Sequence, residues 1–593
     1  MPNPKDELPD LAFSRRGANL SLFLDADSTG SFQVSLVLTR LGKEYDASFL
    51  PIPIPEHVIL DSRWLYISNG LDEANECLRD AGISAFGKIS LTQYCRLIAL
   101  DDAGLMPTTV INKREIAPHV QEAIPPSSLA ATLYPYQKAG FSWLSYMSHE
   151  AHGCILGDEM GLGKTLQIIS LLLSRHESGH STSLVIAPAS LLENWKREIE
   201  KFAPSLSVDI HHGSDRTGRW KALITYDVVV LSYSTANHDL GMLRMNTWDV
   251  LVLDEAQSIK NPDSLTSQTV KDIPHAFGIA VSGTPFENHV LDVWSIMEFV
   301  EPAVFGERRY FSETYSDDPG GAAKLEPCLT PFLLRRTVKE VASELPPRIE
   351  SSIPLPLSPD EAEAYEQIRA QCLEEVEPAR ATLSSLTKLR MFCTHPSLVG
   401  VYGNDPEETS VKYQYLCLLI GKVAQKNEKS LVFTSYTKMI EILRTDLSKR
   451  FALPVYVING EVPIEKRQPI IDEFSNVSGP AVLVLNPVAA GTGLNITAAT
   501  NVIHYNPEWN PAKEDQATAR AYRRGQTQPV RIFKLYYVDT VEEAIFERME
   551  LKREMAKAAV VGTDGTKSDR EAIIKALTST PIQKDCHKDR ENR

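Results

Sequence analysis

Residues 153–173 have the sequence GCILGDEMGLGKTLQIISLLL, in which an apolar strand passes through a glycine-rich turn into an amphipathic helix. A turn of this kind gathers backbone N–H groups and the positive end of the helix dipole around a phosphate. Lys164 is then placed to reach the β- and γ-phosphates of a nucleotide, and the Thr165 hydroxyl to ligate Mg²⁺. The strict pattern has glycine where Asp158 stands, and here the glycine comes one position earlier. We predict a phosphate-binding loop; a chance glycine turn is the alternative for this motif taken alone.

The same alternation of apolar strand and amphipathic helix extends from this loop to about residue 310 and returns between about 412 and 539. Buried strands joined by crossover helices are typical of parallel sheets. We therefore predict the α/β class, with two RecA-like parallel-sheet lobes, a helical inter-lobe insertion and a small α+β N-terminal domain. The expected boundaries are an accessory N-terminal domain (1–125), a first lobe (126–312), a helical bridge (313–411), a second lobe (412–560) and a C-terminal tail (561–593).

The N-terminal domain has its own pattern. Apolar and polar positions alternate around the turn-like segments DADSTGS and LGKE, which predicts short antiparallel strands. Helices are expected near Leu71–Asp80 and Leu91–Ile98. Because no chemical motif falls here, we expect residues 1–125 to be a docking domain that selects a substrate or contacts a protein partner.

Composition excludes several classes of protein. With 43% hydrophobic and 23% charged residues the chain is typical of globular proteins. No stretch approaches the roughly 20 apolar residues of a membrane span, and the N-terminus has no secretory pattern. The eight cysteines stand singly, so a disulfide framework or zinc knuckle is not expected. The net charge of −16 argues mildly against indiscriminate nucleic-acid binding.

A second motif, Val250-Leu-Val-Leu-Asp254-Glu255-Ala-Gln257, follows about 90 residues after the loop. Four apolar residues that end in two carboxylates place Asp254 and Glu255 at the carboxyl edge of a buried strand. There Asp254 would hold Mg²⁺ and Glu255 would orient or deprotonate an attacking water. An acidic pair is often only a solvated strand end, but in the same lobe as a phosphate loop it indicates nucleotide hydrolysis.

A third motif covers Gln516 to Gln526 and contains Arg520 and Arg523. Three positions apart on a helix, these two guanidiniums would share one face. Such a face suits an anion, and an arginine that reaches a γ-phosphate stabilises the charge of phosphoryl transfer. The alternative is a solvated basic helix turn.

Further segments occur between these motifs in a fixed order. They are Leu133-Tyr-Pro-Tyr136-Gln137, Pro188-Ala-Ser190-Leu-Leu-Glu-Asn194-Trp195, Ser282-Gly283-Thr284-Pro285, Pro331-Phe-Leu-Leu-Arg335-Arg336-Thr337, Val432-Phe-Thr-Ser435, Gly491-Thr-Gly493-Leu494-Asn495 and Trp509-Asn-Pro511. Together with the three motifs they resemble the SWI/SNF-type ATPases of helicase superfamily two, from about Leu133 to Glu543.

The resemblance implies roles for individual residues. A nucleotide site would be formed by Gln137, Asp158, Glu159, Met160, Gly161, Leu162, Gly163, Lys164, Thr165, Gly493, Arg520 and Arg523. Nucleic-acid contacts would come from Ser190, Trp195, Asn288, Ser435, Asn495 and Trp509. Coupling of hydrolysis to lobe movement would involve Gln257, Ser282, Gly283 and Thr284.

The resemblance also implies an activity, which is ATP- and Mg²⁺-dependent movement along DNA, mainly double-stranded and independent of sequence. The chain departs from the family at Gln257, where histidine is frequent, and at Ala519, where an aspartate commonly precedes the first arginine. Asn486-Pro-Val488 replaces a Ser/Thr-Lys-Ala type run, which puts one phosphate contact of the second lobe in doubt. None of these changes removes a group needed for hydrolysis.

Two other functions stay open at this point. One is a nucleic-acid-independent ATPase switch that acts on a protein partner, which the acidic charge and residues 1–125 favour. The other is an RNA-directed helicase, against which the Arg335-Arg336-Thr337 and Cys393-Thr-His-Pro396 segments count. The compact chain favours a prokaryotic cytoplasmic, nucleoid-associated enzyme over a nuclear one, with no membrane partner.

Overall fold

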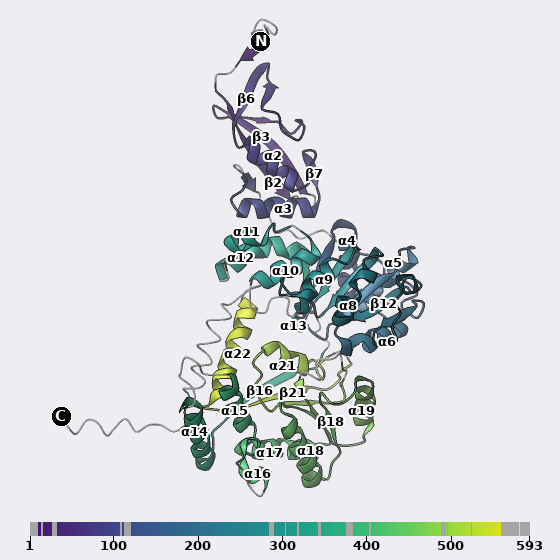
Figure 1. The fold of residues 1–593 in the computed structure, drawn as a ribbon, viewed down its shortest axis with the longest axis vertical. Helices are drawn as coiled ribbons and strands as arrows, with labels where there is room; N and C mark the ends of the chain where they lie inside the picture. Colours follow the sequence, from purple (N-terminus) through teal and green to yellow (C-terminus); the bar gives the residue numbers. More distant parts are fainter. Residues whose placement is uncertain are drawn as a thin grey trace, which may run out of the picture. The chain divides into compact units, whose positions relative to one another are not determined.

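The computed structural model describes residues 10–13, 16–26, 32–106, 109–111, 120–283, 290–302, 304–316, 319–341, 345–374, 383–401, 405–487, 494, 496–523, 525–558 and 580–581. These residues fall into two compact units. The first comprises the chain up to Asp158 and Lys164–Arg335, and the second comprises Glu159–Gly163 and Arg336–Ala558. The fold-class prediction is confirmed, because each unit contains a parallel sheet flanked by helices (Figure 1).

The N-terminal part of the first unit is a mixed sheet with two helices beside it (Figure 1). Strand β2 pairs antiparallel with β3 but parallel with β6 and β8, so the expectation of antiparallel strands is only partly right. Its strands are β1 (Ala12–Phe13), β2 (Ala18–Ala26), β3 (Phe32–Arg40), β4 (Lys43–Asp46), β5 (His57–Leu60), β6 (Arg63–Asn69), β7 (Gly87–Ile89) and β8 (Thr109–Ile111). Helix α2 spans Leu71–Asp80 as expected, and α3 spans Leu91–Asp102, one turn beyond the predicted end.

Helix α3 packs on the helical end of the first lobe. The Arg96 guanidinium donates to the Pro302 carbonyl at 2.7 Å, and the Lys324 ammonium donates to the Asp102 carbonyl at 2.8 Å. Cys95 and Cys328 are both fully buried there. The N-terminal domain is therefore joined to the first lobe through side chains as well as through the chain.

The sheet of the first lobe has the order β11-β12-β10-β13-β14-β9-β15, and all its described pairings are parallel. Every residue of β10 and β12 is buried, as expected of a sheet covered on both faces. Its strands are β9 (Gly153–Leu156), β10 (Ser183–Ala187), β11 (Val208–His211), β12 (Val228–Ser232), β13 (Trp248–Asp254), β14 (His275–Val281) and β15 (Leu333–Leu334). Its helices are α4 (Pro135–Glu150), α5 (Lys164–Glu177), α6 (Leu192–Phe202), α7 (Trp220–Leu223), α8 (Tyr233–Leu243), α9 (Leu265–Lys271), α10 (Val290–Val300), α11 (Arg308–Thr314) and α12 (Pro319–Leu329), with short 3₁₀ turns η1 (Ala189–Leu191), η2 (Ala256–Ile259) and η3 (Thr330–Phe332).

The sheet of the second unit has the order β16-β21-β20-β17-β19-β18 and is again parallel. Its strands are β16 (Arg348–Leu355), β17 (Lys429–Phe433), β18 (Val455–Ile458), β19 (Ala481–Leu485), β20 (Asn501–His504) and β21 (Val530–Tyr537). Its helices are α13 (Val338–Val341), α14 (Pro359–Glu374), α15 (Leu383–Thr394), α16 (Pro406–Thr409), α17 (Val411–Gln425), α18 (Thr437–Phe451), α19 (Ile464–Asn476), α21 (Pro511–Thr518) and α22 (Val541–Ala558), with the 3₁₀ turn η5 (Pro396–Val399).

The segment 313–411 is not helical throughout. Strand β15 extends the sheet of the first lobe beside β9, and β16 forms an edge of the second sheet beside β21. Both strands pair with partners more than 150 residues away in sequence, which local periodicity does not reveal. None of the helices in the described parts of the chain has the length and apolarity that a bilayer crossing requires.

Candidate active site

Four neighbouring strands of the first sheet end at one edge. In the order β10-β13-β14-β9 the strands are parallel, and the register pairs Asp254 with Val281 and Val281 with Leu156. Because parallel strands present their carboxyl ends together, the segments that follow them are neighbours. This edge collects Ser190, Asp254, Ser282 and the loop of residues 157–163.

The loop has the backbone of a phosphate cradle. Gly161 and Gly163 adopt φ angles of 93° and 75°, which L side chains rarely occupy. Lys164 begins α5, and its ammonium donates to the Asp158 carbonyl at 2.6 Å. Gly161 and Gly163 therefore have the left-handed backbone that a glycine-rich phosphate loop uses, and the phosphate site itself stays a prediction.

Asp158, the departure from the strict loop pattern, is fully buried. Its Oδ2 accepts a hydrogen bond from Gln167 Nε2 on α5 at 3.3 Å, so its side chain faces the helix. The neighbouring Glu159 accepts from the Val338 amide at 2.6 Å and donates its own amide to the Arg336 carbonyl at 2.8 Å. These two carboxylates fix the start of the loop.

Asp254 ends β13 as a half-buried carboxylate with donors on both oxygens. Its Oδ1 accepts from the Glu255 amide at 3.0 Å and its Oδ2 from the Trp195 indole at 2.8 Å. Burial, and then the charge of Glu255, raise the pKa of Asp254 to about 6. The ionised form of Asp254 is thus disfavoured by its surroundings, and a bound cation would favour it.

Glu255, Gln257 and Ser282 form a chain of hydrogen bonds across two strand ends. Glu255 has φ +52°, a left-handed conformation that is costly for a residue with a side chain and occurs often at functional sites. Gln257 Nε2 donates to Glu255 Oε2 at 2.6 Å, and Ser282 Oγ donates to Gln257 Oε1 at 3.0 Å. Of the predicted coupling residues, Gln257 therefore contacts Glu255, the candidate water activator, and Ser282 contacts Gln257, with Gly283 following Ser282.

Thr165 and Asp254 fit a magnesium site. Both offer hard oxygen ligands, and Mg²⁺ in nucleotide sites is held by one or two such groups plus phosphate oxygens and water. Among the described residues, no three His, Cys, Asp or Glu side chains converge on a metal position by themselves. This donor set suits a cation that arrives with a nucleotide.

Gln137 and Trp195 are both deeply buried, and each has a structural contact. Gln137 Oε1 accepts from the Tyr134 amide at 3.1 Å and so caps α4. Trp195 was expected to contact nucleic acid, but its side chain is 2% exposed and its indole is bonded to Asp254. That expectation is corrected for the Trp195 side chain, whereas Ser190, half-buried in η1, stays a candidate contact.

The carboxyl edge of the second sheet carries hydroxyls and amides. Thr434 Oγ1 donates to Asn506 at 2.8 Å, and Asn486 Nδ2 donates to the Ser435 carbonyl at 3.1 Å. Ser435 Oγ in turn donates to Glu508. Ser435 therefore lies in a polar network at this edge.

Trp509 is half-buried, and the Arg548 guanidinium lies over its ring at 4.4 Å from the centroid. Cation–π contact of this kind occupies one face of the indole. A base or sugar would have to use another part of Trp509, so its nucleic-acid role stays a prediction.

Arg520 and Arg523 lie in the second unit, beyond the end of α21. The helix stops at Thr518, and residues 519–523 form turns, so the two arginines do not share a helix face as expected. The Arg520 carbonyl accepts from the Ile496 amide at 2.9 Å, a bond to another segment that replaces helix continuation. Arg520 is buried and Arg523 is half-buried. Four further predicted residues, Thr284, Asn288, Gly493 and Asn495, fall outside the described residues.

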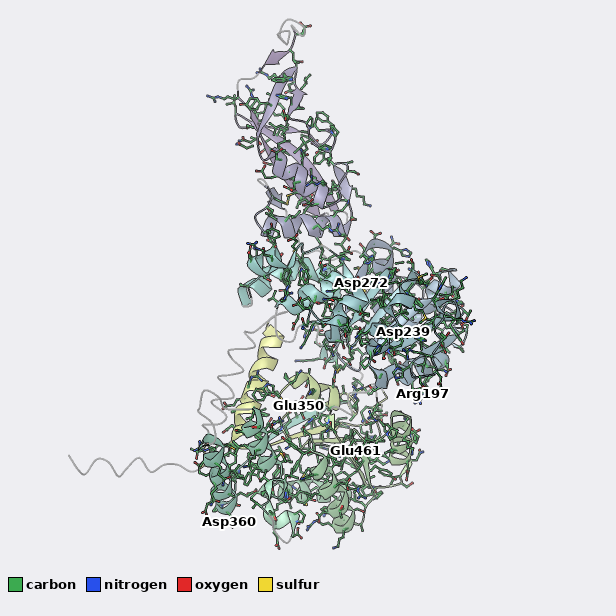
Figure 2. All side chains as sticks on the ribbon, viewed as in Figure 1. Arg197, Asp239, Asp272, Glu350, Asp360 and Glu461 are labelled. Carbon is green, nitrogen blue, oxygen red and sulfur yellow. The ribbon has the colours of Figure 1, made fainter. Side chains whose placement is uncertain are left out.

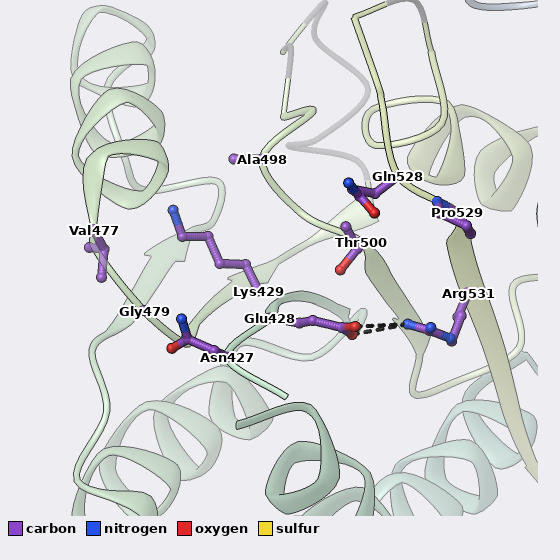
Figure 3. A pocket seen from close by; sticks show the side chains of 10 residues that line it. All are labelled: Asn427, Glu428, Lys429, Val477, Gly479, Ala498, Thr500, Gln528, Pro529 and Arg531. Carbon is purple, nitrogen blue, oxygen red and sulfur yellow. Dashed lines mark hydrogen bonds and ion pairs between the residues drawn. The ribbon is translucent and has the colours of Figure 1, made fainter. Parts of the chain in front are cut away.

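A pocket of about 350 Å³ in the second unit lies away from this edge (Figure 3). It is lined at the amino ends of β17 and β21, where Glu428 and Arg531 form an ion pair at 3.0 Å. Parallel strands separate it from Ser435 and Glu508, so it is not part of the candidate site.

Sequence reasoning missed three contacts at these edges. Trp195 holds Asp254, the Tyr233 hydroxyl donates to the Asp254 carbonyl at 2.8 Å, and Glu508 bonds Ser435. Each joins residues at least 21 positions apart, so no local pattern indicates it. The only signal was that Trp195 stands in an amphipathic helix whose apolar face must be buried.

Comparison with protein families gives a direct match over this architecture. Residues 136–398 match the SNF2-related domain, and residues 411–525 match the helicase conserved C-terminal domain. The chain belongs to the SNF2 family. Its core is that of an ATP hydrolase, and the family implies the use of ATP.

Several named proteins are similar to this SNF2 chain. A putative ATP-dependent helicase/translocase of Bacillus subtilis, YwqA, is 37% identical over 469 residues, covering 75% of this chain and 50% of the relative. Zorya protein ZorD of Escherichia coli is 31% identical over 532 residues, covering 79% of this chain and 48% of ZorD. Chromodomain-helicase-DNA-binding protein 1-like of Danio rerio is 35% identical, covering 73% and 44%. The chain spans about half the length of the curated relatives it matches.

Among solved structures, the Sulfolobus solfataricus SWI2/SNF2 ATPase core in complex with dsDNA is 32% identical. The match covers 77% of this chain and 99% of that one, with a TM-score of 0.39. At this TM-score the superposition carries no argument, and the fold rests on the sheet topology described above.

Proposed function

We propose that this SNF2 protein is an ATP-dependent translocase on double-stranded DNA, whose movement remodels protein–DNA complexes. The observation that carries the proposal is the edge of the first sheet, where the phosphate loop, the Asp254–Glu255 pair and the Gln257–Ser282 chain lie on adjacent strands. One edge thus offers phosphate binding, water activation and a connection to a neighbouring strand.

The residues divide the work of hydrolysis. Lys164 neutralises the β- and γ-phosphates, and Thr165 with Asp254 would hold Mg²⁺, which neutralises developing charge when bound. Glu255, aimed by its left-handed backbone and by Gln257, orients the attacking water. Arg523 of the second unit is the candidate arginine for the transition-state charge.

Movement along DNA needs contacts that do not depend on base sequence. Ser190 in η1 and Ser435 after β17 each follow the carboxyl end of a strand, where hydroxyls and backbone amides suit phosphate oxygens. Affinity built on phosphate contacts falls as salt rises, so binding should weaken steeply between 50 and 200 mM salt. The names of two similar proteins, the putative helicase/translocase YwqA and the chromodomain-helicase-DNA-binding protein 1-like of Danio rerio, support this substrate class.

The test is the steady-state ATPase rate with no nucleic acid, single-stranded DNA, double-stranded DNA and RNA. Stimulation chiefly by duplex DNA is expected, followed by displacement of the third strand from a triplex. Stimulation chiefly by RNA would instead indicate the RNA helicase. A high rate indifferent to all three would indicate an ATPase switch for a protein partner.

Lys164→Ala is the reference for this assay. Loss of the ammonium from the phosphate loop should reduce turnover at least roughly 10²–10³-fold, below detection in a routine assay. Lys138→Ala, which removes an exposed lysine from α4, should turn over normally. Normal turnover of Lys164→Ala would rule out the loop as the ATP site.

A further inference from the structure

Trp195 has a contact that the proposed mechanism does not use. It lies in the first turn of α6, is 2% exposed, and donates its indole N–H to Oδ2 of Asp254 at 2.8 Å. A neutral donor on an ionised acceptor makes a charge-assisted hydrogen bond, roughly twice as strong as a neutral one. The bond joins a helix to the carboxylate expected to hold the metal.

The indole completes a two-point hold on that carboxylate. The Glu255 amide binds Oδ1 at 3.0 Å while Trp195 binds Oδ2, so each oxygen has one donor. A carboxylate oxygen accepts more than one hydrogen bond, which leaves lone pairs for a cation. With both donors present, the plane of the Asp254 carboxylate is fixed before a cation arrives.

Trp195 is also linked to the predicted DNA contact by a short path. The 3₁₀ turn η1, which contains Ser190, leads directly into α6, and Leu191 and Leu192 at the junction are buried. A displacement of η1 is therefore passed to the first turn of α6 and to the indole.

We propose that Trp195 is a positioning residue that sets the Asp254 carboxylate for Mg²⁺ and transmits nucleic-acid binding at η1 to it. The transmission rests on the proposed function, whereas the positioning requires only nucleotide and metal binding. The stimulation of the ATPase by DNA then depends in part on the Trp195–Asp254 hydrogen bond inside the first lobe.

The chain offers a matched control in Trp248. It lies on β13, the strand that ends at Asp254, and is 1% exposed. Its indole N–H donates to the Leu243 carbonyl at 3.1 Å, a backbone acceptor, instead of a carboxylate. Trp248→Phe thus removes a buried indole donor of equal size without touching the Asp254 carboxylate.

The first measurement is the affinity of the full chain for Mn²⁺ in the presence of ADP, with Mn²⁺ binding detected by electron paramagnetic resonance. Partners of metal ligands typically contribute 10–100-fold to metal affinity. We expect Trp195→Phe to weaken Mn²⁺ binding by roughly 10–100-fold and Trp248→Phe by less than about twofold. Equal affinities in the two variants would overturn the positioning role.

The second measurement is the ratio of duplex-stimulated to basal kcat. Trp195→Phe should lower this ratio by roughly tenfold, in line with loss of a positioning partner. An unchanged ratio would overturn the link to η1. If the wild-type protein binds Mn²⁺ and ADP but shows no duplex stimulation, the proposed function fails while the Mn²⁺ comparison still decides the positioning role.

A third variant separates shape from hydrogen bonding. β-(3-Benzothienyl)alanine at position 195 has the size of tryptophan, with sulfur in place of the N–H. This side chain fills the space of the indole, which phenylalanine does not, so the variant protein should fold even if Trp195→Phe does not. It should reproduce the Mn²⁺ defect of Trp195→Phe. Wild-type Mn²⁺ affinity in this variant would show that Trp195 acts through packing alone.

Discussion

At the carboxyl edge of the first sheet, β13 ends in Asp254, which Glu255 follows, and both carboxylates are half-buried. Trp195 bonds Asp254, Gln257 bonds Glu255, and Ser282 bonds Gln257. At the same edge of the second sheet, β17 is followed by Thr434 and Ser435, which bond the amide of Asn506 and the carboxylate of Glu508. The two sheets are both parallel, but the side chains at their carboxyl edges differ.

The difference shows what each edge is built for. In the first, the surroundings of the half-buried Asp254 raise its pKa and so disfavour its ionised form, and a left-handed backbone at Glu255 positions the second carboxylate. In the second, the buried carboxylate of Glu508 accepts from the Ser435 hydroxyl, and the neutral groups beside it satisfy one another, as when Asn506 also donates to Thr394 at 2.6 Å. We infer that hydrolysis is confined to the first edge, and that the second supplies contacts and the arginines of residues 519–526.

Glu255→Gln tests this division most severely. The amide keeps the shape of Glu255 but cannot accept a proton, so ATP should still bind while kcat falls by roughly 10²–10⁴-fold. Single-turnover hydrolysis and nucleotide affinity measure the two effects. Glu193→Gln, an exposed change on α6, is the control. Normal turnover of Glu255→Gln would remove the assignment of the water activator.

Arg523→Ala tests whether the second unit contributes charge to the reaction. Loss of a transition-state arginine should slow kcat by roughly 10³-fold with nucleotide affinity nearly intact. Arg531→Ala, which breaks an ion pair at the amino ends of the same sheet, should leave kcat unchanged. Equal rates in the two variants would make Arg523 a structural residue.

Asp254→Asn tests the stability cost of the first edge. Because the folded-state pKa of Asp254 is raised to about 6 from 3.8, the folded protein keeps a proton that the unfolded chain has released. The cost therefore grows as pH rises through this window and is fully present above it. The variant should be inactive yet more stable than wild type to urea at pH 7.5, with the difference vanishing near pH 4.

Asp239→Asn is the matched substitution, and it should change the stability at pH 7.5 in the opposite direction. Hydrogen bonds from Arg216 and then His211 lower the pKa of Asp239, which is labelled in Figure 2. A lowered pKa gives stability that is present at neutral pH and lost on acidification, so Asp239→Asn should be less stable than wild type at pH 7.5. Destabilisation by both changes would contradict the reading of Asp254 as a strained charge.

Ser282→Ala gives the smallest expected effect. It removes one neutral hydrogen bond to Gln257, of about 1 kcal/mol, so duplex-stimulated kcat should fall about fivefold. Ser267→Ala, which breaks a buried hydroxyl pair with Ser295 at 3.1 Å, is the control. A stimulated rate equal to that of the control would disconnect Ser282 from Glu255.

The parts of this site that the sequence predicted are local in the chain. The strand, turn and helix around Lys164, and the apolar run before Asp254, are each encoded within about 20 residues. Periodicity and glycine placement determine such segments, and the structure has them at the expected positions. The two parallel sheets follow from the same alternation.

The parts that could not be predicted depend on distant partners. The Trp195–Asp254 bond spans 59 residues, and the pairing of β15 with β9 spans more than 170. The helix expected through Arg523 ends at Thr518, where the Arg520 carbonyl bonds Ile496 and Gln526 Nε2 bonds the carbonyls of Thr497 and Ala499 at 3.0 Å. Tertiary hydrogen bonds overrode local helix propensity there.

The chain leaves the first sheet through β15, and β15 and the residues after it are hydrogen-bonded to the start of the phosphate loop. The Gly157 amide donates to Leu334, the Glu159 amide to Arg336, and the Val338 amide to Glu159. A displacement of residues 333–338 would therefore strain the backbone of the loop, because these hydrogen bonds join the two segments. Breaking these hydrogen bonds would expose the amides of Gly157, Glu159 and Val338 to hydrogen exchange together. Their exchange rates therefore report how firmly the loop is held during the ATP cycle.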